Sequence, residues 1–169
     1  IHSYRFTELS PIFLRRGQRA LAARADARDR LVSARLDMNR PFAEAGVEPG
    51  GFSVVYGVNT LHAAHDLAFT LSEIRVALAP GGVVIASECV RPFPQRTVYV
   101  EFIFALLETF RSPRLQPEWR PNGGFLTPEQ WLAAFRAAGF SDPFVWPDIP
   151  RIRERYPSFV AAAVGATRL

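Results

Sequence analysis

The chain has 169 residues, of which 49% are hydrophobic and 21% charged, a length and composition that suit one globular domain. Its formal net charge is +4, and all of its positively charged side chains are arginines. These arginines are too scattered along the sequence for a nucleic-acid interface. No apolar run is long enough to span a membrane. The single cysteine excludes an internal disulfide and no cysteine–histidine cluster has metal-ligand spacing, so we expect no metal and a cytoplasmic protein.

The first third of the sequence predicts two short strands joined by a helix. Residues 4–9 are rich in types that favour strands, and the Ser-Pro pair that follows suits the start of a helix running to about residue 25. Residues 31–36 form the second predicted strand. A short helical turn is expected over residues 41–45.

Two further segments predict neighbouring buried strands whose carboxyl ends carry polar residues. Residues 52–58 are followed by Asn59 and His62. Residues 83–87 are followed by Glu88. The helix expected between these strands forms a right-handed crossover, which makes the strands parallel and brings their carboxyl ends side by side. Open α/β sheets bind ligands at that edge.

The last third of the chain predicts two helices and two strands. Residues 98–110 are strongly apolar, and the length of this run favours a buried helix over a strand. Thr127 is followed by proline and, three residues later, by glutamine, which is typical of a capping box at the start of a helix over residues 128–138. Short strands are expected over residues 144–146 and 159–164.

Four short motifs lie along the chain: F-T-E-L-S at residues 6–10, N-x-L-H at 59–62, L-x-P-G-G at 78–82 and A-A-G-F at 137–140. Their order resembles that in the class I S-adenosylmethionine-dependent methyltransferases. The first motif is similar to the F-T-D-I/L-S run of the type associated with polyketide synthases. The resemblance implies an α/β fold with a Rossmann-like sheet, mostly parallel with an antiparallel last strand, and helices on both faces.

The chain departs from this family at its amino-terminal end. The family opens with a strand and a glycine-rich loop of the kind G-x-G-x-G, whereas residues 1–16 contain no glycine. We therefore expect residues 1–169 to be a single methyltransferase-like domain that lacks its amino-terminal part. The resemblance also implies a substrate lid insertion over residues 90–126. Five aromatic residues in this segment either line an apolar pocket or belong to the core: Phe102, Phe104, Phe110, Trp119 and Phe125.

The resemblance further implies which residues bind the cofactor, S-adenosylmethionine. Glu8 would accept hydrogen bonds from the ribose hydroxyls, and Asp37 from the adenine amino group. Met38 would pack on the adenine ring, and Asn59 would face the methionine portion. Each polar residue has a structural alternative: Glu8 as a solvated strand-end carboxylate, Asp37 as the cap of the following turn, and Asn59 as a turn residue.

His62 and Glu88 are the candidate catalytic residues. Neighbouring strands lie about 5 Å apart, so side chains at their carboxyl ends come close together. A carboxylate that accepts one imidazole N–H selects the tautomer and leaves the other nitrogen to remove a substrate proton. His62 could instead be a packed histidine with a satisfied hydrogen bond, and His65 could compete for the catalytic role.

The sequence therefore favours methyl transfer from S-adenosylmethionine to an oxygen or activated carbon of a small, largely apolar metabolite, polyketide-like or aromatic, with a histidine general base. The expected partner is this small-molecule acceptor, and a homodimer is also compatible with the sequence. Two alternatives stay open. One is a catalytically inactive methyltransferase-like partner protein, and the other is a nicotinamide-dependent oxidoreductase, whose second strand also ends in an acidic residue.

Overall fold

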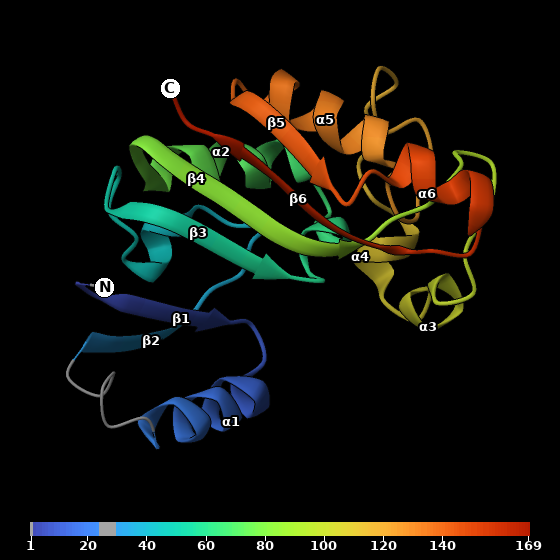
Figure 1. The fold of residues 1–169 in the computed structure, drawn as a ribbon. Helices are drawn as coiled ribbons and strands as arrows, with labels where there is room; N and C mark the ends of the chain where they lie inside the picture. The colour runs from blue at the N-terminus through green and yellow to red at the C-terminus, as the bar shows by residue number, and fades with distance from the viewer. Residues whose placement is uncertain (1, 24–29) are drawn as a thin grey trace. The chain divides into compact units, whose positions relative to one another are not determined.

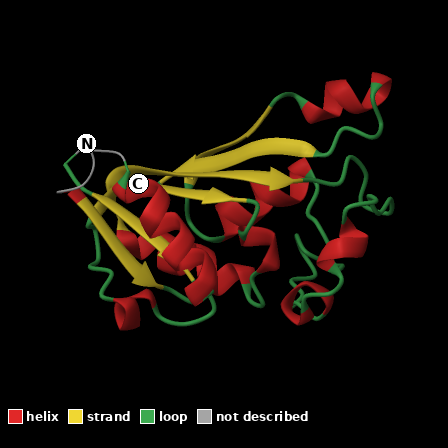
Figure 2. Ribbon diagram, turned by 90° about the horizontal axis from the view of Figure 1, so that it is seen from below, coloured by secondary structure: helices red, strands yellow, loops and turns green. Residues whose placement is uncertain are grey.

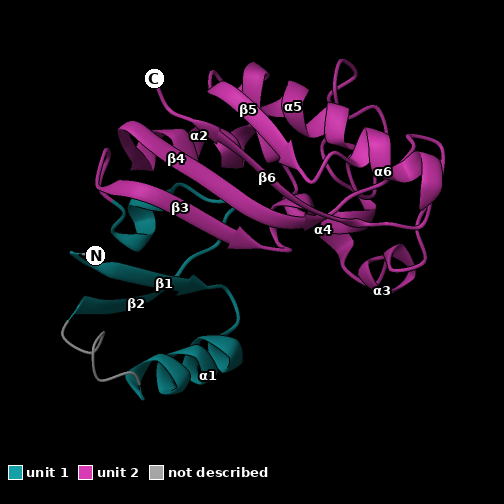
Figure 3. Ribbon diagram, in the orientation of Figure 1, with its two compact units in different colours: residues 1–47 teal, residues 48–169 magenta. Residues whose placement is uncertain are grey.

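The computed structural model describes residues 2–23 and 30–169, which form helices and two β-sheets (Figures 1 and 2). The chain divides into two compact units, unit 1 over residues 1–47 and unit 2 over residues 48–169 (Figure 3). Each unit has its own sheet, with two strands in unit 1 and four in unit 2.

Unit 1 is a parallel strand–helix–strand arrangement followed by a short turn. Its elements are β1 (Tyr4–Glu8), α1 (Pro11–Ala22), β2 (Leu31–Arg35) and the 3₁₀ turn η2 (Phe42–Ala45). Helix α1 approaches β1 so closely at Gly17 that an added Cβ would collide with the Phe6 ring. The predicted strands, helix start and turn are confirmed, and residues 24 and 25 of the predicted helix lie outside the described residues.

Unit 2 contains a four-stranded sheet in the order β3-β4-β6-β5. Its elements are β3 (Phe52–Val58), η3 (Leu61–Ala63), α2 (Leu67–Ala77), β4 (Leu78–Cys89), α3 (Glu101–Phe104), α4 (Glu108–Arg111), α5 (Pro128–Ala137), β5 (Ser141–Trp146), α6 (Ile149–Arg155) and β6 (Ala161–Thr167). Strands β3 and β4 pair in parallel, whereas β6 runs antiparallel to both β4 and β5. This arrangement confirms the expected α/β sheet with an antiparallel last strand.

Helices α2 and α5 pack on this sheet (Figure 1). Each of them begins at a residue whose side chain caps the helix. At the start of α2, the Asp66 carboxylate accepts a hydrogen bond from the Phe69 backbone N–H. At the start of α5, Thr127 and Gln130 form the two hydrogen bonds of the predicted capping box. The large side chains that α2 and α5 bury completely are Leu67, Leu71, Ile74, Trp131 and Phe135. These side chains form much of the core beneath the sheet.

The prediction of one buried helix over residues 98–110 is wrong. This segment forms two short helices, α3 and α4, because the backbone of Leu107 is extended between them. Phe102 is 83% exposed, although it lies in the middle of the apolar run. Glu101 is buried in an ion pair with Arg91, and Val100 and Phe104 pack against a core cluster, so these contacts bury their side chains and leave Phe102 exposed.

The carboxyl-terminal region also differs from the prediction. Helix α6, which the sequence analysis did not predict, starts at a cap where Asp148 accepts a hydrogen bond from the Arg151 backbone N–H. Strand β6 spans Ala161–Thr167 rather than residues 159–164. Strand β6 pairs with β4 on one side and β5 on the other, and this pairing extends it to Thr167. The local sequence does not indicate this extension.

Candidate active site

The structure brings His62 and Glu88 together at the carboxyl ends of β3 and β4. His62 lies in the turn η3, directly after β3, and Glu88 is the penultimate residue of β4. Nδ1 of His62 lies 2.5 Å from Oε2 of Glu88, and both side chains are completely buried. The parallel pairing of the two strands causes this contact, since it places both ends at one edge of the sheet.

The Glu88 carboxylate is held by three hydrogen bonds in all. Besides the contact with His62, its Oε1 accepts hydrogen bonds from the backbone N–H groups of Thr60 at 3.1 Å and Leu61 at 2.8 Å. These N–H groups lie at the start of η3, where the turn itself leaves them without partners. Glu88 therefore orients both the imidazole ring and the turn that carries it.

The second ring nitrogen of His62, Nε2, is buried and makes no hydrogen bond with any residue that the structure describes. A carboxylate only accepts hydrogen bonds, so Nδ1 is the donor and Nε2 of the neutral ring carries the lone pair. Three aromatic rings stand edge-on to the imidazole, Phe104 and Phe125 at 4.7 Å and Phe110 at 5.7 Å between centroids. Leaving a buried polar nitrogen without a hydrogen bond costs about 1–3 kcal/mol.

His65 does not compete for the contact with Glu88. Its side chain is exposed, whereas that of His62 is buried. Of the two histidines, the structure therefore pairs only His62 with the carboxylate.

Asn59 connects the ends of β3 and β4. Its backbone adopts a positive φ of 48°, and its N–H donates to the carbonyl of Ser87 at 2.6 Å. Its side-chain Oδ1 accepts a hydrogen bond from the Cys89 N–H at 3.2 Å. Asn59 is therefore a turn residue, which was one of the two alternatives that the sequence left open. Its contact with a cofactor stays a prediction.

The other three candidate cofactor residues lie in unit 1. Glu8 ends β1, and its Oε1 accepts a hydrogen bond from the Ser10 N–H at 2.9 Å. Asp37 follows β2, and its Oδ1 accepts hydrogen bonds from the backbone N–H and the side-chain amide of Asn39 at 2.9 and 3.2 Å. Met38 is half-buried beside Asp37. Both carboxylates thus lie at the carboxyl edge of one parallel strand pair, and their contact with a cofactor stays a prediction.

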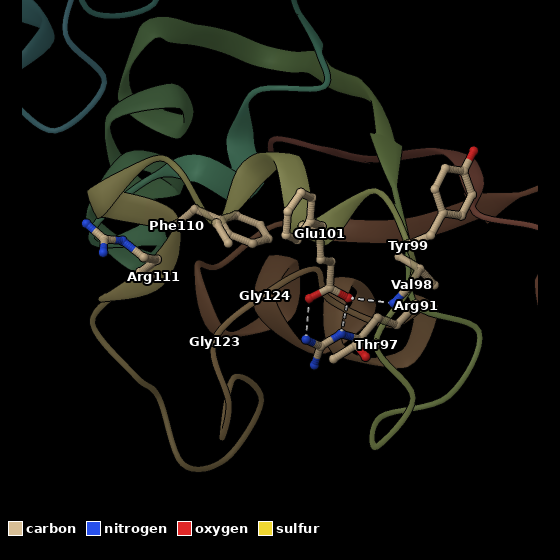
Figure 4. Close-up of a pocket in the computed structure, with 11 residues that line it drawn as sticks. Arg91, Thr97, Val98, Tyr99, Glu101, Phe110, Arg111, Gly123 and Gly124 are labelled. Carbon is tan, nitrogen blue, oxygen red and sulfur yellow. Dashed lines mark hydrogen bonds and ion pairs between the residues drawn. The ribbon is translucent and has the colours of Figure 1, made fainter.

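A pocket of about 590 Å³ lies beside α3 and α4 in unit 2 (Figure 4). Arg91 and Glu101 form a bidentate ion pair in it, with Nε–Oε1 and Nη2–Oε2 distances of 2.7 and 2.5 Å. Gly124 lies so close to this pair that an added Cβ would collide with both side chains. Phe110 lines the pocket and also contacts the His62 ring, so the pocket and the pair of His62 and Glu88 share this side chain.

The sequence analysis missed three buried charged residues of unit 2: Arg91, Glu101 and Arg120. A signal for Glu101 was present, because it is the only charged residue between positions 97 and 107. Arg91 and Arg120 lie in proline-containing segments with no periodic pattern, and nothing in the local sequence distinguishes them from the exposed arginines.

We expect the Cys89 thiol to react slowly with alkylating reagents. Burial raises the pKa of Cys89 above its usual value of 9.0, and the nearby charge of Glu88 raises it further. Because the thiolate is the reactive form, little of it is present until the pH exceeds this raised pKa. The measurement is the rate of iodoacetamide labelling between pH 7 and 9, with the urea-unfolded protein as control. Glu88→Gln should accelerate labelling of the folded protein, and an unchanged rate would contradict the electrostatic contribution.

The described residues contain neither a membrane-spanning helix nor a metal-binding cluster. No helix in this part of the chain is both long and apolar enough to cross a membrane. Nor do three or more histidine, cysteine or acidic side chains gather here into a group that could hold a metal ion.

Comparisons with known proteins identify relatives of the chain, although no protein-family model matches it. It is 31% identical over 153 residues to the polyketide synthase ThaG of Burkholderia thailandensis, which covers 88% of this chain and 2% of ThaG. The CurJ carbon methyltransferase superposes with a TM-score of 0.80 at 27% identity, over 98% of this chain and 41% of that chain. The trans-methyltransferase CalH, solved in complex with SAH, superposes with a TM-score of 0.76 at 27% identity, over 99% of this chain and 43% of that chain.

This chain thus spans less than half the length of each of these proteins. The likeness nevertheless extends over nearly the whole of this chain and includes the antiparallel last strand, the feature that the motifs predicted. The chain thus has the fold of the class I S-adenosylmethionine-dependent methyltransferases and is similar in sequence to proteins of the type associated with polyketide synthases.

Proposed function

We propose that this chain transfers a methyl group from S-adenosylmethionine to a small, largely apolar, polyketide-like acceptor, and that His62 is the general base. The observation that carries the proposal is the buried pair of His62 and Glu88 with an unpartnered Nε2. Among the relatives, CalH was solved with SAH and CurJ is a carbon methyltransferase, which favours an activated carbon over an oxygen as the methylated atom.

The bound cofactor would supply an electrophilic methyl group on a sulfonium. The chain's own contribution is to align the acceptor and to remove its proton. Nε2 of His62 takes that proton, so the electron pair of the broken C–H or O–H bond becomes available to the methyl carbon. The imidazolium that forms keeps its Nδ1–H bond to Glu88, and the carboxylate stabilises its positive charge.

The acceptor needs access to Nε2, which Phe104, Phe110 and Phe125 enclose. Phe104 and Phe110 lie on the short helices α3 and α4, within the lid that we propose over residues 90–126. The neighbouring pocket, at about 590 Å³, is of the size that holds small molecules. We infer that the acceptor binds in this pocket and displaces Phe110 to reach the base.

Glu8 and Asp37 fit the nucleoside part of the cofactor, since each is a carboxylate at the end of a strand and can accept a hydrogen bond from a hydroxyl or an amino group. We expect Glu8→Ala to weaken cofactor binding by about 1–3 kcal/mol, the cost of removing a charge-assisted hydrogen bond. The measurement is calorimetric titration of the complete protein with SAH. Glu48→Ala, which removes an exposed carboxylate, is the control. Equal affinity in both variants would contradict the placement of the ribose on Glu8.

A binding and turnover experiment distinguishes the proposed function from its alternatives. The complete protein is titrated with S-adenosylmethionine and with NADH, and is then incubated with ¹³C-methyl-labelled cofactor and a panel of β-ketoacyl thioesters and phenols. Binding of S-adenosylmethionine and a new ¹³C-methyl signal on carbon are expected. Binding of NADH alone would favour the oxidoreductase, and cofactor binding without product on any acceptor would favour the inactive partner protein.

A further inference from the structure

Arg120 is a completely buried arginine in the segment between α4 and α5. No carboxylate among the described residues forms an ion pair with it. Burial lowers the pKa of Arg120 to about 10, although the charge of Asp66 partly opposes this shift. The guanidinium is therefore still a cation at neutral pH. Burying such a cation without an ionic partner costs free energy. The hydrogen bonds of the guanidinium identify the groups that Arg120 contacts.

The guanidinium of Arg120 donates to the turn that carries His62. Its Nη2 donates to the backbone carbonyl of His62 at 2.9 Å, and its Nη1 to that of Ala64 at 3.4 Å. These carbonyls lie at the end of η3, where a short turn leaves its C=O groups without intrahelical partners. The planar fork of arginine reaches both carbonyls at once, which a single ammonium group does less well.

The segment around Arg120 is itself fastened to the same stretch of chain. The backbones of Gln116 and Arg120 exchange two hydrogen bonds of 2.6 and 3.0 Å, which close the loop between them. The backbone N–H of Arg114 donates to the backbone carbonyl of His65 at 2.6 Å, a contact that does not depend on the Arg114 side chain. The loop thus gives Arg120 a defined position beside η3.

We infer that Arg120 is a positioning residue for His62. The turn η3 is held at both ends: the Glu88 carboxylate accepts from the N–H groups at its start, and the Arg120 guanidinium donates to the C=O groups at its end. The amino end of a turn carries a partial positive charge and its carboxyl end a partial negative charge. The Glu88 carboxylate and the Arg120 guanidinium therefore each lie next to a partial charge of opposite sign. The two anchors together set the orientation of the His62 ring and the direction of Nε2. This inference rests on the proposed function of His62.

The test compares Arg120→Gln and Arg120→Lys with a matched control, Arg114→Gln, which removes an exposed ion pair from the same loop. Nitrogen NMR of ring-labelled histidine reports the tautomer and hydrogen bonding of His62 directly, without turnover. We expect Arg120→Gln to change the His62 ring signals and to lower kcat by up to about 10²-fold, the effect of a small misplacement, with cofactor affinity unchanged. Arg120→Lys should show a smaller change in both, and Arg114→Gln none.

Wild-type His62 signals and full kcat in a folded Arg120→Gln variant would overturn the inference. If that variant does not fold, Arg120→Lys decides: shifted ring signals with reduced kcat support positioning by the guanidinium fork, and wild-type values overturn it. The NMR measurement also separates this inference from the proposed function. If the wild-type protein transfers no methyl group, the proposed function fails, whereas the His62 signals of the variants still show whether Arg120 sets the ring.

Discussion

Replacing His62 by alanine is expected to lower the turnover of methyl transfer roughly 10²–10⁴-fold, the usual contribution of a positioned general base. Cofactor affinity should be nearly unchanged, because the proposed role of His62 is directed at the acceptor proton. Nε2 makes no hydrogen bond with any residue in the described part of the chain, whereas Nδ1 already contacts Glu88. The measurement is single-turnover kinetics with labelled cofactor, combined with calorimetric titration of SAH.

Two further variants make this prediction specific. His65→Ala removes an exposed histidine three residues away, and it should retain wild-type turnover. Glu88→Gln should cost less than His62→Ala, since the amide can keep the ring in place but loses the negative charge that stabilises an imidazolium. If His62→Ala retained full turnover on the true acceptor, alignment alone would account for catalysis and the pair of His62 and Glu88 would be structural.

The second large effect concerns the stability of unit 2. Glu101→Leu is expected to destabilise the fold by about 3–5 kcal/mol, the cost of leaving one partner of a buried ion pair alone. The side chains of Arg91 and Glu101 are only 9% and 10% exposed, so the remaining guanidinium would be an unpaired buried charge. The Glu101 carboxylate also accepts a hydrogen bond from the backbone N–H of Val98 at 3.0 Å, and Glu101→Leu removes this hydrogen bond as well. Urea denaturation measures the free energy of unfolding.

A double variant separates the unpaired charge from the loss of the pair itself. Arg91→Met combined with Glu101→Leu should be more stable than Glu101→Leu alone, because apolar side chains of similar volume often replace a buried ion pair at little cost. Arg114→Gln breaks the exposed pair with Asp66 and should change stability by less than about 1 kcal/mol. A double variant that lost as much as the sum of both single variants would show that the charges do not interact.

The sequence by itself determined the elements whose signals are local. Strand β3 and the capping box at Thr127 lie where the local sequence pattern predicted them. The prediction that β3 is buried is wrong, because Val54, Tyr56 and Val58 are 55%, 60% and 62% exposed, and β4 spans Leu78–Cys89 rather than residues 83–87 because its pairing with β3 and β6 extends it. The contact of His62 with Glu88 was also predictable, although the residues are 26 positions apart. A right-handed crossover makes the two strands parallel, so their carboxyl ends, with His62 and Glu88, lie at the same edge of the sheet.

Only the tertiary structure decided how the segment after β4 folds. An apolar run without a polar stripe does not specify which face is buried, and the ion pair of Arg91 with Glu101 is a contact between segments that the run itself does not indicate. The same holds for Arg120, whose partners are backbone carbonyls 56 and 58 positions earlier in the chain. Backbone carbonyls are identical at every position, so no sequence pattern indicates which of them a distant arginine will bind. The conformation of residues 90–126 and the contacts of Arg120 therefore depend on how distant segments pack, because burial creates the need for these polar contacts.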